Sequence, residues 1–78
     1  MEKSPITLYG TTWCGDCHRT KAFLDDRKIP YREIDIEQDE AAAELVMRHN
    51  DGKRRVPTLE IAGRYYGNPS IAELRSLV

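Results

Sequence analysis

The chain reads Thr12-Trp13-Cys14-Gly15-Asp16-Cys17 between a segment patterned as a strand and one patterned as a helix. Residues 6–9 alternate in character as a strand does, and Gly10 begins a break in that pattern. A helical pattern then extends from about Cys14 to Lys28, where Pro30 cannot continue it. Cys14 and Cys17 are therefore predicted to lie where a strand passes into a helix, one turn apart.

A second strand and a second helix follow. Residues 31–36 are a predicted strand that places Glu33 and Asp35 on one face, and a polar face is typical of a strand at a sheet edge. Residues 39–49 repeat apolar side chains at helical spacing. Residues 50–52 tolerate a left-handed backbone and are predicted to end that helix.

The C-terminal part reads as a hairpin and a helix. Residues 56–61 and 64–66 are predicted strands joined by a tight turn. The last helix opens either at Asn68, with a proline in its first position, or at Ser70, with a glutamate placed for a capping box. Its predicted apolar stripe consists of Ile71, Leu74 and Val78.

These elements give the order β-α-β-α-β-β-α. The first strand, helix and strand form a right-handed parallel unit, and the hairpin adds two antiparallel strands. The predicted fold is therefore an α/β fold with a mixed four-stranded sheet flanked by three helices. Because so short a chain supports one small core, we expect residues 1–78 to form a single domain.

Composition excludes several classes of function. The net charge of −1 gives no global attraction to nucleic acid or to anionic membranes. No apolar run approaches the roughly 20 residues of a membrane helix, and no leader pattern is visible. The expected location is cytoplasmic, where a close cysteine pair is more often catalytic or metal-binding than structural.

The position of the two cysteines predicts different roles for them. Cys14 lies at the helix N-terminus, where free N–H groups and the helix dipole favour a thiolate, so it is the expected nucleophile. Cys17 lies one turn inside and is the expected resolving thiol, which attacks a mixed disulfide on Cys14. The negative charge of Asp16 should oppose the Cys14 thiolate, although His18 and nearby basic residues partly offset it.

A proline opens the predicted third strand. In a fold of this order, a cis Val56–Pro57 bond would face the cysteines and present the backbone of Val56 to a thiol substrate. The alternative is an ordinary trans proline at the start of a strand. The cysteine pair favours the first interpretation.

The residues that carry a family resemblance are the Thr12–Cys17 motif, Val56-Pro57-Thr58 and the turn before the last helix. Together they resemble the glutaredoxins, which have the thioredoxin-like fold, and the similarity spans nearly the whole chain. Within that family the sequence is most similar to the mycoredoxins. The segments that carry this second resemblance are residues 35–37, 41–44, 50–52 and 68–70.

The resemblance implies reduction of mixed disulfides between proteins and mycothiol, a small thiol, through catalytic Cys14 and Cys17. It implies protein mixed-disulfide clients, a low-molecular-weight thiol (mycothiol or glutathione) as co-substrate, no tightly bound cofactor and no metal, and we expect a monomer. We expect Trp13 to shield the thiol and contribute to docking. The expected substrate-binding residues are Thr12, Trp13, Arg55, Val56, Pro57, Asn68, Pro69 and Ser70.

The sequence also departs from the glutathione-binding pattern of that family. The usual lysine before the cysteine motif is absent, and residues 67–70 (Gly-Asn-Pro-Ser) lack the usual second glycine and aspartate. These differences weaken glutathione as the substrate. Arg55 replaces the usual threonine before Val56, and with Arg54 it forms a basic edge that could meet a substrate carboxylate. A solvated basic turn is the alternative.

Three other functions fit parts of the sequence. Cys14-x-x-Cys17-His18 matches the c-type haem attachment pattern, with Met47 as a distal ligand. Two cysteines with His18 or His49 could bind zinc or an iron–sulfur cluster, if a dimer shared the metal. The third alternative is a general redoxin that a flavoprotein reductase recycles.

Overall fold

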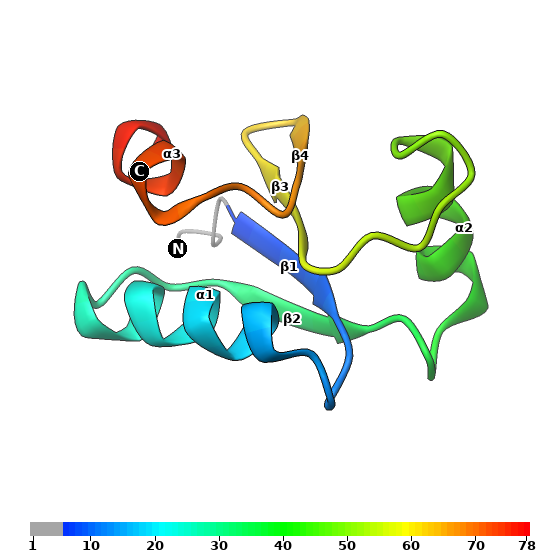
Figure 1. Ribbon diagram of the computed structural model, residues 1–78, viewed down its shortest axis with the longest axis horizontal. Coiled ribbons are helices and arrows are strands. Elements are labelled where there is room, and N and C mark those ends of the chain that lie inside the picture. Colours follow the sequence, from blue (N-terminus) through cyan, green and yellow to red (C-terminus); the bar gives the residue numbers. More distant parts are fainter. Residues whose placement is uncertain (1–5) are drawn as a thin grey trace, which may run out of the picture.

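The computed structural model describes residues 6–78, and its elements follow the predicted order (Figure 1). In chain order they are β1 (Ile6–Gly10), α1 (Gly15–Asp26), β2 (Arg32–Asp35), α2 (Glu40–Arg48), β3 (Thr58–Ile61), β4 (Arg64–Gly67) and α3 (Ile71–Leu77). The prediction of an α/β fold of this order is confirmed. No helix within residues 6–78 is long and apolar enough to cross a membrane.

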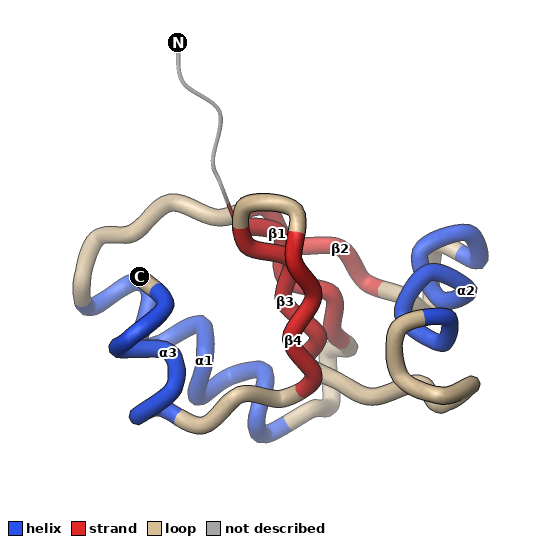
Figure 2. The backbone as a smooth tube through the Cα atoms, turned by 90° about the horizontal axis from the view of Figure 1, so that it is seen from above, coloured by secondary structure: helices blue, strands red, loops and turns tan. Residues whose placement is uncertain are grey.

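The four strands form one sheet in the order β2-β1-β3-β4. β1 runs parallel to β2, whereas β1 with β3 and β3 with β4 are antiparallel pairs. The sheet is therefore mixed, and β2 lies at its edge as the polar face of that segment predicted. Figure 2 shows α1 and α3 on one side of the sheet and α2 on the other.

Each face of the sheet carries its own core, because successive side chains of β1 point to opposite faces. Leu8 lies in the core under α1 and α3, and Tyr9 lies in the core under α2. The buried members of the first core are Ile6, Leu8, Leu24, Leu59 and Leu74. The buried members of the second core are Tyr9, Ile36, Ala42, Ala43 and Val46.

The third strand begins two residues later than predicted. Pro57 has no N–H for the ladder, and its carbonyl accepts a hydrogen bond from the Asn68 N–H at 2.7 Å. Pairing of β3 with β4 starts at Thr58, opposite Gly67. Residues 56 and 57 thus form a loop beside the sheet rather than part of a strand.

The last helix settles one open question and corrects one prediction. Ser70 is the N-cap: its hydroxyl accepts from the Glu73 N–H at 3.1 Å, and its own N–H donates to the Glu73 carboxylate at 2.8 Å. The prediction that Val78 completes the apolar stripe is wrong. Val78 follows the last turn and is 44% exposed, because the helix ends at Leu77.

Candidate active site

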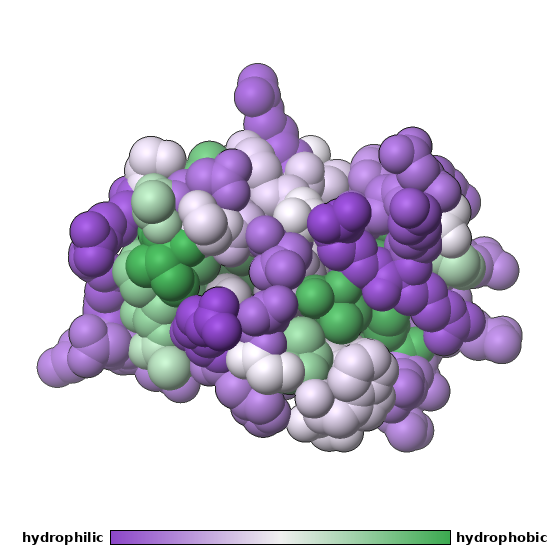
Figure 3. Space-filling model, in the orientation of Figure 1, coloured by the Kyte–Doolittle hydropathy of each residue, from purple (hydrophilic) through white to green (hydrophobic). Residues whose placement is uncertain are grey.

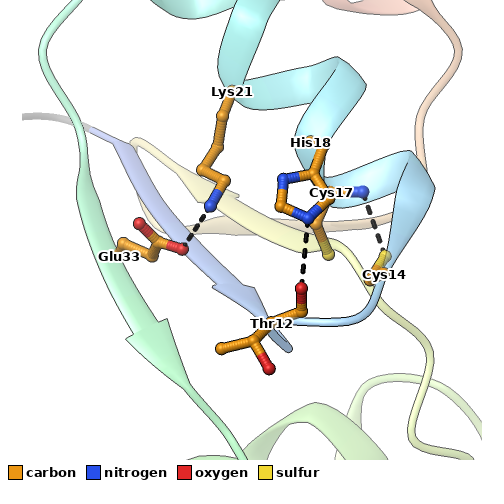
Figure 4. Close-up of polar contacts among 6 residues, drawn as sticks. All are labelled: Thr12, Cys14, Cys17, His18, Lys21 and Glu33. Carbon is orange, nitrogen blue, oxygen red and sulfur yellow. Dashed lines mark hydrogen bonds and ion pairs between the residues drawn. The ribbon is translucent and has the colours of Figure 1, made fainter.

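Cys14 is the N-cap of α1, and its backbone is extended there (φ −84°, ψ 113°). Its sulfur accepts a hydrogen bond from the Cys17 N–H at 3.0 Å (Figure 4). Side-chain acceptors at this position satisfy the N–H groups that the first helical turn leaves unpaired. A sulfur in that place can carry negative charge, because it faces the positive end of the helix dipole.

Both cysteines are free thiols, and they differ in their surroundings. Cys14 is 6% exposed and Cys17 is 1% exposed. Burial, followed by a side-chain hydrogen bond between the two thiols, raises the pKa of Cys17 to about 12. Cys17 is therefore a neutral thiol at physiological pH.

Gly10, at the end of β1, lets Cys17 lie against the sheet. A Cβ atom at Gly10 would lie 2.6 Å from the Cys17 sulfur and 3.1 Å from Leu8 Cδ2. Sequence reasoning treated Gly10 only as the break after a strand. A glycine at the end of a buried strand, facing the start of a helix, is the signal that could have identified this close approach.

The loop before β3 contains a cis Val56–Pro57 peptide bond, in agreement with one of the two interpretations of this proline. Side chains outside the loop hold it. The Thr58 hydroxyl donates to the Arg55 carbonyl at 2.7 Å, and Asn50 Nδ2 donates to that hydroxyl at 3.2 Å. Asn50 and Thr58 are supporting residues that sequence reasoning did not assign to the site, since neither chemistry nor spacing distinguishes them.

Asn68 connects three segments around the cysteine pair. Its backbone N–H donates to Pro57, and its Nδ2 donates to Asp16 Oδ2 at 3.2 Å. Asp16 also forms an ion pair with Arg19 at 3.2 Å. The carboxylate of Asp16 is thus directed at Asn68 and Arg19, and this pairing partly balances the charge that was expected to oppose the Cys14 thiolate.

Two hollows lie beside the cysteine motif. The first, of about 250 Å³, is lined by Asp16, Arg19, Thr20 and residues 68–71. The second, of about 200 Å³, is lined by Thr11, Trp13, Ile36, Glu37, Arg54 and Val56. Figure 3 shows apolar side chains at the surface in two places, one over α1 and α3 and one between the sheet and α2.

Five of the eight predicted substrate-binding residues line these two hollows. Asn68, Pro69 and Ser70 line the first hollow, and Trp13 and Val56 line the second. Thr12 is exposed, and its carbonyl accepts a hydrogen bond from His18 Nε2 at 3.1 Å (Figure 4). Pro57 is buried beside Val56.

Arg55 lies apart from the others. It is exposed and lines neither of these two hollows, and its Cδ lies 2.5 Å from where a Cβ of Gly67 would stand. Its neighbour Arg54, which was expected to form a basic edge together with Arg55, lines the second hollow instead.

The histidines considered as metal ligands have other contacts. His49 stacks on Tyr65, with ring centroids 3.8 Å apart and 12° between the planes. His18 contacts Thr12, as described above. Among residues 6–78, no group of three or more His, Cys, Asp or Glu side chains could hold a metal ion.

A thiol at the N-terminus of the first helix, a second thiol one turn on and a mixed sheet define a thioredoxin-like redox protein. The glutaredoxin family model matches residues 6–66. The chain belongs to the glutaredoxin family and is a glutaredoxin-like disulfide oxidoreductase. Membership of this family favours a redox role for the cysteine pair over the haem-attachment alternative.

Individual relatives agree with this assignment. The chain is 44% identical over 77 residues to a putative glutaredoxin of Mycobacterium tuberculosis, covering 97% of this chain and 92% of that protein. It is 42% identical over 72 residues to mycoredoxin 1 of Corynebacterium glutamicum, covering 91% and 89%. The predicted resemblance to mycoredoxins is thus confirmed.

Solved structures show the same fold. A thioredoxin-like protein superposes with a TM-score of 0.82 at 29% identity, covering 94% of this chain and 99% of that one. NrdH-redoxin from Escherichia coli, described as a glutaredoxin-like protein with a thioredoxin-like activity profile, gives a TM-score of 0.73 at 25% identity, covering 90% and 91%.

Proposed function

We propose that Cys14 is the nucleophile that reduces mixed disulfides between proteins and a low-molecular-weight thiol, and that this thiol is mycothiol. The observation that carries the proposal is the hydrogen bond from the Cys17 N–H to the Cys14 sulfur. This hydrogen bond stabilises the Cys14 sulfur as an anion, both when its thiolate attacks a disulfide and when that thiolate is released in the second exchange. Reduction of disulfides of this kind belongs in a reducing cytoplasm.

The reaction needs two exchanges. The Cys14 thiolate attacks the small-thiol sulfur of the mixed disulfide, a new S–S bond forms on Cys14, and the client sulfur leaves as a thiolate that takes up a proton. A second small thiol then attacks, as its thiolate, the small-thiol sulfur held on Cys14. That step releases the oxidised disulfide of the small thiol and regenerates the Cys14 thiolate.

The loop before α3 supports a thiol other than glutathione. The Asn68 N–H donates to the Pro57 carbonyl, and the Ser70 N–H donates to Glu73. Because both N–H groups already donate within the protein, neither is available to bind a carboxylate of glutathione. Similarity to mycoredoxin 1 adds to the case for mycothiol.

A second candidate function uses both thiols on a protein disulfide. Cys17 would attack the mixed disulfide on Cys14, expel the client thiol and leave a Cys14–Cys17 disulfide for a flavoprotein reductase. The similarity to NrdH-redoxin favours this route. The raised pKa of Cys17 opposes it, because a thiol must ionise before it attacks.

The deciding experiment supplies protein mixed disulfides with mycothiol and with glutathione to wild type, Cys14→Ser and Cys17→Ser. We expect no turnover by Cys14→Ser, retained turnover by Cys17→Ser, and faster reaction with the mycothiol adduct. Turnover by Cys14→Ser would overturn the assignment of the nucleophile. Equal rates on the two adducts would overturn the choice of mycothiol, and loss of activity in Cys17→Ser would favour the dithiol route.

A further inference from the structure

We propose, on the basis of the function above, that Lys21 is a positioning residue for Cys17: its ammonium group stabilises the Cys17 thiolate as that thiolate attacks the disulfide on Cys14. Cys17 first loses its proton to water. A Cys14–Cys17 bond then forms, the bond from Cys14 to the small thiol breaks, and the small thiol leaves as a thiolate. This attack competes with the second small thiol, so Lys21 influences how often the protein closes its own disulfide.

The helix places Lys21 next to Cys17. Side chains four residues apart on a helix are neighbours, with Cβ atoms about 5–6 Å apart. Figure 4 shows both side chains extending from α1 toward the strands of the sheet. The side chain of Lys21 is only 21% exposed, so its charge lies between the helix and the sheet rather than in open solvent.

Glu33, in β2, holds the ammonium group in this place. Lys21 Nζ donates to the Glu33 carboxylate at 2.8 Å. This hydrogen bond raises the pKa of Lys21, so its positive charge is present at physiological pH. An ammonium group has three donors, and the bond to Glu33 uses one of them.

The other basic side chains of α1 have different partners. The ring of His18 contacts the Thr12 carbonyl at 3.1 Å, and Arg19 forms its ion pair with Asp16. Lys21 is thus the basic residue of this helix that is directed at the sheet, where Cys17 also lies.

The charges around Cys17 change when Cys14 reacts. In the free protein, burial and then the bond between the thiols raise the pKa of Cys17, and the charge of Lys21 lowers it. Once Cys14 is part of a disulfide, it has neither a proton to share nor a negative charge. Its opposition to the Cys17 thiolate then ends, and the attraction by Lys21 remains.

The test uses an aromatic disulfide, dithiobis-nitrobenzoate, which releases a coloured nitrothiobenzoate at each exchange. Attack by Cys14 releases the first one at a rate that rises with reagent concentration. Attack by Cys17 on the resulting mixed disulfide releases the second at a rate independent of that concentration. Stopped-flow absorbance at pH 7 separates the two phases, and Cys17→Ser should lack the second.

We expect Lys21→Met to slow the second phase about 2- to 10-fold. Loss of a charge about 6 Å away has an effect of this size between water-like and surface-like screening. Lys21→Arg keeps the charge and should restore most of the rate. The first phase should stay close to that of wild type, because Lys21 is two helical turns from Cys14.

Glu33→Gln distinguishes an electrostatic role of Lys21 from a structural one. Glutamine still accepts the hydrogen bond from Lys21, but it removes the negative charge that offsets the ammonium group. We therefore expect a second phase as fast as in wild type or faster. Arg48→Met is the control for loss of a positive charge, because Arg48 is exposed on α2, across the sheet from Cys17 (Figure 2). Both of its phases should match wild type.

Several outcomes would overturn the inference. These are a wild type without the second phase, a Lys21→Met variant with the wild-type rate, and a Lys21→Arg variant as slow as Lys21→Met. A Glu33→Gln variant as slow as Lys21→Met would also overturn it, since the ion pair would then act by holding α1 to β2. Absence of the first phase in wild type would instead contradict the proposed function, in which Cys14 is the nucleophile.

Discussion

At the scale of single residues, the two cysteines show how one helical turn separates two kinds of sulfur. Cys14 caps the helix and accepts an N–H, whereas Cys17 is enclosed between α1 and the end of β1. The order of the two residues in the chain predicted these surroundings, because only the first can lie at the N-terminus. The nearness of Gly10 to Cys17 could not be predicted, since it depends on how closely α1 packs on the sheet.

Gly10→Ala is expected to destabilise the protein by about 1–3 kcal/mol, as overpacking of a filled site does. The added methyl would lie 2.6 Å from the Cys17 sulfur, so the start of α1 must move. Urea denaturation at pH 7 measures the free energy of unfolding.

Gly15→Ala is the control, because a Cβ there meets nothing within 4 Å. Alanine is also a better helix former than glycine, so this variant should be as stable as wild type or more stable. Equal stability of both alanine variants would contradict the close approach of Gly10 and Cys17.

At the scale of elements, the site is assembled from segment ends rather than from helix or strand interiors. The end of α2 reaches the loop before β3 through Asn50, whose Nδ2 donates both to the Val46 carbonyl and to the Thr58 hydroxyl. The start of α3 reaches the same loop through Asn68, and reaches α1 through Asp16. The geometry around Cys14 therefore depends on how these ends are capped.

Ser70→Ala should lower the free energy of unfolding by about 1 kcal/mol, the usual effect of removing an N-cap side chain. The change removes the hydroxyl that accepts from Glu73. Ser76→Ala is a matched control at the other end of α3, where the exposed hydroxyl only donates to the Glu73 carbonyl. A Ser70→Ala protein as stable as Ser76→Ala would contradict the capping box as a source of stability.

At the scale of the whole molecule, one sheet separates two small cores. Several side chains packed there end in an ionisable hydroxyl or thiol, so the stability of the fold depends on pH. Burial is the main cause of the raised pKa of Tyr9 and of Tyr65, which lie on the α2 side. Burial also raises the pKa of Tyr31 and of Cys17. The hydrogen bond to Glu33 raises the pKa of Lys21, which joins α1 to β2 (Figure 4).

All these shifts have the same consequence for stability against pH. Such a group has a higher pKa in the folded than in the unfolded state. Its contribution to the free energy of unfolding is fully present below the unfolded-state pKa, and it is lost as pH rises through the folded-state pKa. We therefore expect the free energy of unfolding to be steady from pH 7 to about pH 8 and to fall above pH 9, near the unperturbed pKa values of thiols and phenols.

Urea denaturation between pH 7 and pH 11 tests this expectation. Tyr9→Phe removes one ionising group at a buried position, so the fall in its stability should be smaller than in wild type. The exposed Arg64→Gln, in β4, offers a control whose pH dependence should match wild type. Stability that stays constant to pH 11 would contradict the burial of these groups.

The sequence alone determined the element order, the edge position of the second strand and the place of the cysteine pair, because periodicity, proline positions and helix caps are local properties. It also predicted Val56 and Pro57 as site residues from the position of the proline, and Asn68 through resemblance to a family. Tertiary structure decided which contacts these residues make. The hydrogen bonds of Asn68 to Pro57 and Asp16 join segments that are distant in the chain, and the close approach of Gly10 to Cys17 joins two elements packed face to face. Such contacts depend on how helices settle on the sheet, and no local pattern encodes that packing.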